Sequence, residues 1–136
     1  IPDNYVNKVD ERLKLYQELD QVKDEKELEH YAEALKDRFG PLPSEVEELF
    51  DSLRLRRLGR KIGFEKIVLK QERLLCYFTS DQDSPYFQSE RFQKVLLHLQ
   101  AYKEAQLKER NNKLYLSYQK VSSVHQAYSI LQSILQ

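Results

Sequence analysis

The sequence predicts an α+β fold: three N-terminal helices, then a small antiparallel sheet of about four strands in two hairpins, with two further helices. Apolar residues recur at helical spacing up to about Lys61 and change to short β-branched and aromatic runs after Phe64. With 32% charged residues, 3 Gly and 4 Pro, the composition is typical of a helix-rich domain rather than a disordered chain. The length of 136 residues fits a single domain, 1–136.

The first helix is expected near residues 5–21, where apolar residues recur at intervals of three or four. The inward residues of this helix are Val6, Val9, Leu13, Tyr16 and Leu19. Asp24 and Glu27 form a predicted capping box for the second helix, which ends at Phe39. Its apolar stripe consists of Leu28, Tyr31, Ala32, Leu35 and Phe39.

A rigid corner is predicted between the second and third helices, formed by Arg38, Phe39, Gly40, Pro41 and Pro43. Gly40 can take the left-handed conformation that ends a helix, and Pro41 cannot continue one. Pro43 suits the first turn of the next helix because its missing N–H has no partner there. We expect Phe39 to anchor the core at this corner.

The third helix is expected to run to about Lys61, with Gly63 ending it. If it starts one residue after Pro43, Ser44 and Glu47 can form its capping box. Its predicted inward residues are Val46, Leu49, Phe50, Leu53 and Leu58.

Two hairpins are predicted after the third helix. The first pairs residues 67–69 with 74–78 across a polar link. The second pairs Ala105–Glu109 with Lys113–Tyr118, and Asn111–Asn112 form its turn because asparagine tolerates positive φ. A hairpin alone is marginally stable, so we expect the two to join in one sheet.

Two further helices are predicted around the second hairpin. The fourth helix begins between Ser84 and Ser89 and ends near Lys103. Its apolar positions are Phe92, Val95, Leu96, Leu99 and Tyr102. Ser122 or Ser123 caps the last helix. The inward residues there are Val124, Ala127, Tyr128, Leu131, Ile134 and Leu135.

No catalytic, metal or cofactor chemistry is predicted. The three histidines, His30, His98 and His125, lie far apart and outside metal-binding spacings. The three glycines form no phosphate-cradling loop, so we expect no nucleotide binding, no cofactor and no enzyme activity. Cys76 lies in an apolar run and is expected to be a buried core residue rather than a reactive thiol.

Charge and hydropathy favour a cytoplasmic protein without membrane contacts. The 22 basic and 22 acidic side chains cancel, so no global field draws the chain to nucleic acid or to an anionic membrane. No apolar run approaches the ~20 residues that span a bilayer, and we expect no leader before the body of the chain. Because the chain begins with Ile1 and contains no methionine, we expect it to be part of a longer polypeptide.

Five cations lie within eight residues at the end of the third helix, Arg54–Lys61. The helix dipole favours cations there by ~0.3–1 kcal/mol each, so a structural role explains them. The alternative is an accessory nucleic-acid-binding patch with Arg54, Arg57 and Lys61 on one face. The interleaved leucines argue against this patch, because stacking on single-stranded bases needs exposed aromatic side chains.

Asp37 lies in the last turn of the second helix, where the dipole disfavours a carboxylate. A compensating cation is therefore expected. It belongs either to this domain, for example to an arginine of the third helix, or to another protein surface.

The corner and its flanks resemble a known bacterial family. The segments Leu35–Gly40 and Pro41–Pro43, followed by Val46, Leu49 and Leu53, resemble the C-terminal domain of the bacterial transcription-repair coupling factor, the Mfd family. Two other segments are similar to the same domain: the chain start (Ile1-Pro2, Tyr5-Val6, Arg12-Leu13 and Tyr16) and Leu58–Ile67 with its Ile62-Gly63 step. The resemblance is strong over roughly the first 70 residues. Beyond them it is limited to the general pattern of the sequence.

The resemblance implies a regulatory domain without catalysis of its own, in a parent protein that is an ATP-dependent DNA translocase. In that family the domain folds back onto an N-terminal module similar to UvrB and hides the surface that would recruit UvrA. This autoinhibition ends when the factor engages stalled RNA polymerase on DNA, which couples transcription to DNA repair. The isolated domain is expected to be a monomer.

The resemblance also implies which residues form the interdomain interface. The family's acidic contact lies on the helix leading into the corner, where Asp37 matches it. Ala34 stands where Glu is common in the family, with Glu33 beside it. Glu33 and Asp37 are therefore the expected interface residues.

Overall fold

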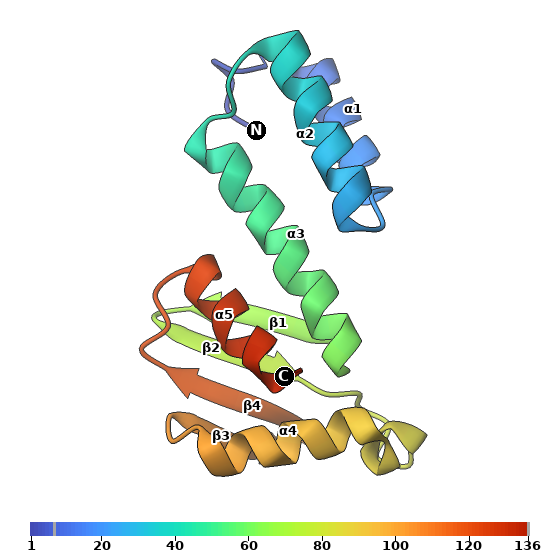
Figure 1. Ribbon diagram of the computed structural model, residues 1–136, viewed down its shortest axis with the longest axis vertical. Coiled ribbons are helices and arrows are strands. Elements are labelled where there is room, and N and C mark those ends of the chain that lie inside the picture. The colour runs from blue at the N-terminus through green and yellow to red at the C-terminus, as the bar shows by residue number, and fades with distance from the viewer. Residues whose placement is uncertain (7, 136) are drawn as a thin grey trace. The chain divides into compact units, whose positions relative to one another are not determined.

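The computed structural model describes residues 1–6 and 8–135 (Figure 1). The elements run in the order α1 (Val9–Asp20), α2 (Glu25–Phe39), α3 (Ser44–Ile62), β1 (Lys66–Lys70), β2 (Arg73–Tyr77), η1 (Pro85–Gln88), α4 (Glu90–Ala101), β3 (Ala105–Arg110), β4 (Lys113–Gln119) and α5 (Val124–Ile134). The predicted α+β fold is confirmed. Contacts divide the chain into two compact units, unit 1 (Ile1–Leu53) and unit 2 (Arg54–Gln136).

Unit 1 has a core of aliphatic side chains and one phenylalanine from its three helices and the N-terminal turn. The buried members are Val6, Leu15, Leu19, Leu28, Leu35, Val46 and Phe50. The start of α2 follows the predicted capping box: Glu27 N–H donates to Asp24 Oδ1 at 2.8 Å. The Glu27 side chain reaches one residue further back than expected and accepts from Lys23 N–H at 2.7 Å.

The first helix differs from the prediction in both its start and its buried face. It begins at Val9, because Tyr5 and Val6 lie in a turn whose N–H groups donate to the Pro2 carbonyl. The predicted inward residues Val9, Leu13 and Tyr16 are 59%, 57% and 38% exposed. Leu15, which was not predicted to face inward, is buried instead, whereas Leu19 is buried as predicted.

Two competing apolar stripes on this helix explain the error. Residues two positions apart lie about 200° apart around a helix, so Leu13 and Leu15 point in nearly opposite directions. Val6 is fully buried, but it lies in the turn before α1. Its burial therefore does not indicate which face of α1 is buried. Only packing against α2 and α3 selects the Leu15 stripe.

Unit 2 contains one antiparallel four-stranded sheet in the order β1-β2-β4-β3, which confirms that the two hairpins join. Both hairpins turn through two residues with positive φ: Gln71 and Glu72 at 53° and 60°, Asn111 and Asn112 at 53° and 63°. Such turns match the right-handed twist of the strands. Strands β2 and β4 join the hairpins, with Cys76 opposite Leu116.

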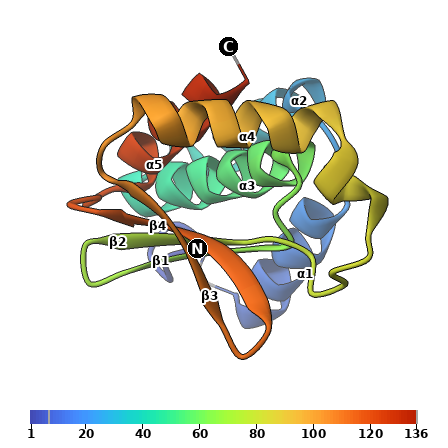
Figure 2. The same cartoon turned by 90° about the horizontal axis from the view of Figure 1, so that it is seen from below.

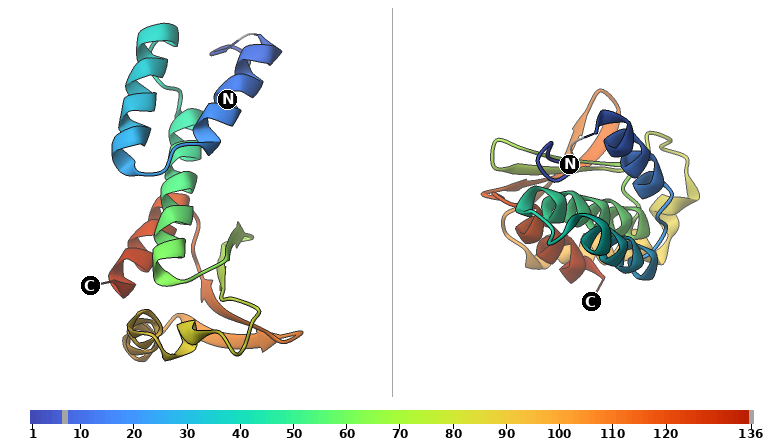
Figure 3. Two further views of the ribbon diagram at one scale, coloured as in Figure 1. Left: turned by 90° about the vertical axis from the view of Figure 1, so that its right-hand side faces the viewer. Right: turned by 90° about the horizontal axis from the view of Figure 1, so that it is seen from above.

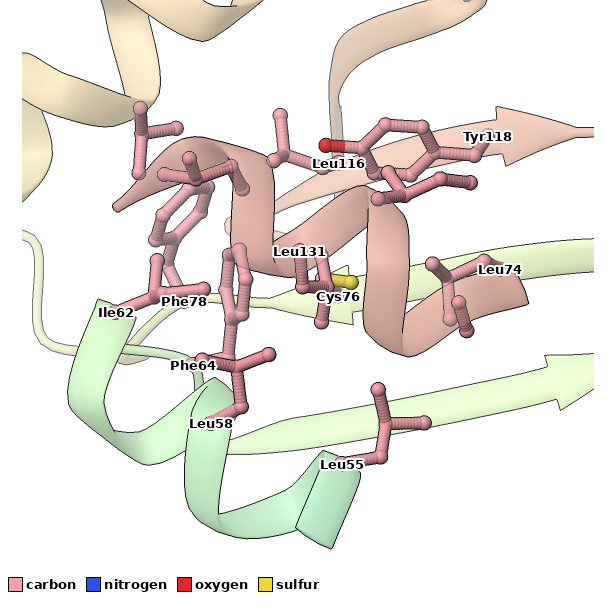
Figure 4. Close-up of a cluster of buried hydrophobic side chains, with 14 of the residues drawn as sticks. Leu55, Leu58, Ile62, Phe64, Leu74, Cys76, Phe78, Leu116, Tyr118 and Leu131 are labelled. Carbon is pink, nitrogen blue, oxygen red and sulfur yellow. The ribbon is translucent and has the colours of Figure 1, made fainter. Parts of the chain in front are cut away.

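The helices of unit 2 cover one face of this sheet (Figures 2 and 3). Side chains from both layers form the core, and Figure 4 shows Leu58 of α3 and Leu131 of α5 together with Cys76 of β2. Cys76 is fully buried, as predicted, and burial raises the pKa of its thiol. The two serines that bracketed the start of the fourth helix both act as caps: Ser84 caps η1 and Ser89 caps α4.

Gly63 closes α3 beside a tightly packed aromatic ring. Its φ is 118°, and its N–H donates to the Gly59 carbonyl at 2.9 Å. A Cβ at this position would overlap the ring of Tyr86, which is buried and donates its hydroxyl hydrogen to Ile62 O at 2.7 Å. Burial raises the pKa of this hydroxyl to about 12, so it remains a donor at neutral pH.

Replacing Gly63 by alanine should therefore destabilise the protein more than the same change at Gly40. Gly40 also has a positive φ, 91°, but nothing lies within 4 Å of a Cβ added there. Gly40→Ala should cost only its backbone strain, ~1–3 kcal/mol, whereas Gly63→Ala adds the overlap with Tyr86. Chemical denaturation of both variants measures the difference, and equal losses would contradict the close packing at Gly63.

Candidate functional site

The corner between α2 and α3 is built around the backbone of Gly40. The φ and ψ of Gly40 are 91° and −170°, and its N–H donates to the Lys36 carbonyl at 2.9 Å, which ends α2. This region of backbone space is open almost only to glycine. The chain then turns through Pro41 and enters α3 within four residues.

The start of α3 differs in detail from the prediction. The helix begins at Ser44, so Pro43 precedes it rather than occupying its first turn. The Pro43 carbonyl accepts from Val46 N–H at 3.1 Å and from Glu47 N–H at 3.2 Å. Ser44 therefore lies in the first turn, and its hydroxyl bonds to nothing in the described ranges. The predicted Ser44–Glu47 capping box does not form, because capping by a side chain requires the residue that precedes the helix.

The N-terminal turn fastens this corner. The Tyr5 hydroxyl donates to the Gly40 carbonyl at 2.8 Å and lies 3.3 Å from the Leu35 carbonyl. The Tyr5 and Phe39 rings pack with centroids 5.8 Å apart. Phe39 is half-buried, so it borders the core instead of anchoring it. Sequence reasoning missed the role of Tyr5 because it placed this residue inside the first helix; the polar Asp3-Asn4 pair after Pro2 was the available sign of a turn.

Arg38 is held on the outside of the same corner. Its guanidinium carbon lies 5.0 Å from the centre of the Phe39 ring, and its Nη2 donates to Glu11 Oε1 at 3.4 Å. Both contacts are solvent-exposed, so each contributes little stability. They do, however, restrict the side chain next to Asp37.

Asp37 is exposed in the last turn of α2, and no hydrogen bond or ion pair reaches it from residues 1–6 or 8–135. The expected cation within the domain is therefore not found there. Glu33, one turn earlier, is exposed and pairs with Lys36 at 3.3 Å. The helix thus presents to solvent a carboxylate at the end where its dipole disfavours one.

The basic stretch at the end of α3 does not form an open patch. Arg54 and Arg57 are half-buried and engaged by other residues, and Arg57 Nη1 is buried. Leu55 and Leu58, which directly follow these two arginines, point into the core of unit 2, with 5% and 7% of their surface exposed. Of the three residues predicted to share a face, Lys61 alone is exposed.

A cavity of about 370 Å³ lies between α4 and α5, and His98 is among the residues that line it. The Tyr118 hydroxyl lies 2.8 Å from His98 Nε2, and Ser133 Oγ lies 3.5 Å from Nδ1. Ser133 Oγ donates its hydrogen to Ile130 O, so it accepts from Nδ1–H. Burial lowers the pKa of His98 and so favours the neutral imidazole. In that form Nε2 carries no hydrogen and accepts from the Tyr118 hydroxyl.

Neither metal binding nor membrane spanning finds support in the part of the chain that the structure describes. Within it, no three His, Cys, Asp or Glu side chains gather closely enough to hold a metal ion. None of its helices combines the length and the apolar character that crossing a bilayer requires.

The first two thirds of the chain, which contain the corner, match a known protein family. The sequence pattern of the TRCF domain matches residues 1–89. The chain belongs to this family. The TRCF domain match includes the whole of unit 1, α3 and the first hairpin, whereas α4, the second hairpin and α5 lie beyond it.

Curated relatives extend this result. The transcription-repair-coupling factor of Escherichia coli (strain K12) is 39% identical over 67 residues, covering 49% of this chain and 6% of that protein. The factor of Rickettsia prowazekii (strain Madrid E) is 27% identical over 114 residues, covering 84% of this chain and 10% of that protein. The chain therefore spans a tenth or less of the length of these relatives.

The fold of this TRCF domain also occurs in a solved structure. A crystal structure described as the C-terminal domain of transcription-repair coupling factor superposes with a TM-score of 0.77 at 18% identity. The match covers 99% of this chain and 85% of that one, so both halves of the chain share its fold.

The buried imidazole should make unit 2 sensitive to mild acid. Because the folded state lowers the pKa of His98, its contribution to stability is complete above about pH 6.5 and is lost as the pH falls toward the lower folded pKa. The facing groups are Tyr118 of β4, Ser133 of α5, Lys94 of α4 and Tyr102, which directly follows α4.

Replacing His98 by glutamine should therefore reduce the fall in unfolding free energy between pH 7 and pH 5.5. Urea denaturation at both pH values measures it. The control is His125→Gln, which removes an exposed histidine of α5 and should keep the wild-type dependence. An unchanged dependence in His98→Gln would show that this imidazole does not titrate with unfolding.

Proposed function

We propose that this TRCF domain is a non-catalytic, autoinhibitory interaction domain of a transcription-coupled DNA repair factor. It docks on a UvrB-like N-terminal module of the same polypeptide and masks the surface that recruits UvrA. The observation that carries the proposal is Asp37: an exposed carboxylate in the last turn of α2, without an ion-pair partner in the described chain. Family membership supports the wider setting.

The electrostatics of α2 favour an external cation. A carboxylate at a helix C-terminus is destabilised by the dipole, and an arginine from a docking surface would remove that cost on binding. Lys36 pairs with Glu33 and Arg38 with Glu11, so the nearest cations of the same helix are engaged elsewhere. Asp37 thus remains available to a partner.

The corner also provides the rigidity that docking requires. Gly40, Tyr5 and the short Pro41–Pro43 link hold the end of α2 in one position. A group presented on a fixed backbone loses little conformational entropy on binding. Glu33, one turn before Asp37, adds a second carboxylate to the same interface.

The wider role follows from the parent protein. The parent is an ATP-dependent DNA translocase that binds RNA polymerase, DNA and UvrA, and the domain releases its module when the factor engages stalled polymerase. The purified domain should itself be a monomer without ATPase activity. The domain acts by changing the free-energy difference between the docked and the released states of the factor.

Reversing the charge at the corner tests the docking. Asp37→Arg should change the melting temperature little, because Asp37 has no hydrogen-bond or ion-pair partner among residues 1–6 and 8–135 to lose. It should weaken binding of the domain to the separate N-terminal module by ~2–5 kcal/mol if the pair is buried there. In the full-length factor the same change should increase UvrA recruitment.

The matched control is Asp20→Arg. Asp20 is also an exposed carboxylate in the last turn of a helix of unit 1, so the change has the same effect on a helix dipole. Calorimetric titration of both variants against the module should show weaker docking for Asp37→Arg alone. Equal docking of the two variants, or early unfolding of Asp37→Arg, would place the interface elsewhere.

A further inference from the structure

The face of the sheet that the helices of unit 2 leave uncovered has an unusual composition. Strand alternation directs Leu74, Cys76, Leu116 and Tyr118 into the core, so their strand neighbours point to the opposite face. These outward strand positions include six cations and no Asp or Glu: Lys66, Lys70, Arg73, Lys108, Arg110 and Lys113. The whole chain has no net charge, so this excess is local.

One row of side chains crosses all four strands of this face. The register places Lys66 opposite Tyr77, Tyr77 opposite Tyr115, and Tyr115 opposite Lys108. The two tyrosines occupy the central strands and are half-exposed, with ring centroids 5.1 Å apart and an interplanar angle of 32°. Lys66 Nζ lies 5.7 Å from the centre of the Tyr77 ring. An aromatic platform is thus flanked by a cation on each side.

A hollow of about 490 Å³ opens over this platform. Its lining includes both tyrosines and four of the cations, Lys66, Arg73, Arg110 and Lys113, against the acid Glu65. Arg73 lies across the sheet, with its Nη2 donating to Ser117 Oγ at 3.4 Å. The positive groups therefore border a concave surface and do not extend singly into solvent.

Stability of the sheet does not account for this arrangement. At the end of each hairpin two cations stand directly opposite each other, Lys70 with Arg73 and Arg110 with Lys113. Like charges in directly opposed positions destabilise a strand pair, whereas opposite charges stabilise it. Two such pairs on one face suggest that their charge serves a polyanionic ligand.

We propose that this uncovered face binds single-stranded nucleic acid. Bases stack on Tyr77 and Tyr115, while Lys66, Arg73, Arg110 and Lys113 hold the phosphates around them. Base stacking on aromatic side chains next to a positive groove is the general chemistry of single-strand recognition. A duplex does not fit it, because paired bases already stack on each other and do not offer their faces. An acidic peptide would use the cations but not the aromatic platform.

This surface differs from the basic stretch at the end of α3, where leucines separate the cations and point into the core. It is also independent of docking at Asp37, which lies in unit 1. The uncovered face of the sheet has both exposed cations and half-exposed aromatic rings. The basic stretch of α3 does not combine the two.

Fluorescence anisotropy of labelled 12-nucleotide strands tests the proposal on the 136-residue chain at about 50 mM salt. Oligo(dT) and oligo(rU) distinguish DNA from RNA, and a preference for either supports the face as a single-strand site. A 12-base-pair duplex and a poly-glutamate peptide are the competing ligands. We expect both to bind at least tenfold more weakly than the preferred single strand.

Variants of the platform separate stacking from charge. Tyr77→Leu with Tyr115→Leu should weaken single-strand binding by at least about 30-fold, because two stacked bases lose their aromatic support at once. Tyr77→Phe with Tyr115→Phe keeps both rings and should bind as the wild type does. Lys66→Gln with Lys113→Gln should lower the slope of log affinity against log salt by about one to two.

The matched control is Arg56→Gln with Arg60→Gln, which removes two exposed cations of α3 that lie outside this face. It should leave binding within about twofold of the wild type. The proposal is overturned if neither strand binds, if the duplex or the peptide competes equally, or if the control variant loses as much affinity as the folded tyrosine or lysine variants. Circular dichroism confirms that each variant is folded.

Discussion

Helix α3 is the element on which both cores depend. Its first half buries Val46 and Phe50 in unit 1, and its second half buries Leu55, Leu58 and Ile62 in unit 2. A single helix can serve two cores only if its ends are set accurately, since each residue of shift rotates the buried stripe by about 100°. Gly40 before the helix and Gly63 after it, both with positive φ, set those ends.

Acidic and basic side chains are equal in number but concentrate in different parts of the chain. Acidic side chains populate the first turns of α2 and α3, where the helix dipole stabilises them, whereas Asp37 lies in a last turn, where the dipole disfavours it. Cations gather on the uncovered face of the sheet, where they oppose one another across strands. In both places a locally unfavourable charge marks a surface on which a function is proposed.

Much of the fold was predictable because the local signals were strong. The Asp24 cap, the Asn111–Asn112 turn and the change of periodicity after Phe64 each depend on nearby residues, and the structure agrees with all three. The phase of α1 was not predictable, because two stripes of similar apolarity compete on it. The corner was predictable from Gly40 and its prolines, whereas the hydrogen bond from Tyr5 joins residues 35 positions apart and has no local signature.

The sequence by itself determined the order of elements, the family resemblance and the carboxylate at the end of α2. These features follow from short-range chemistry: spacing, capping and the conformations open to glycine and proline. The tertiary structure alone decided which side of α1 is buried, that Asp37 has no ion-pair partner in the described chain, and that Tyr77 and Tyr115 stand side by side. The physical reason is that burial and cross-strand register depend on packing between segments far apart in the chain, which no local pattern records.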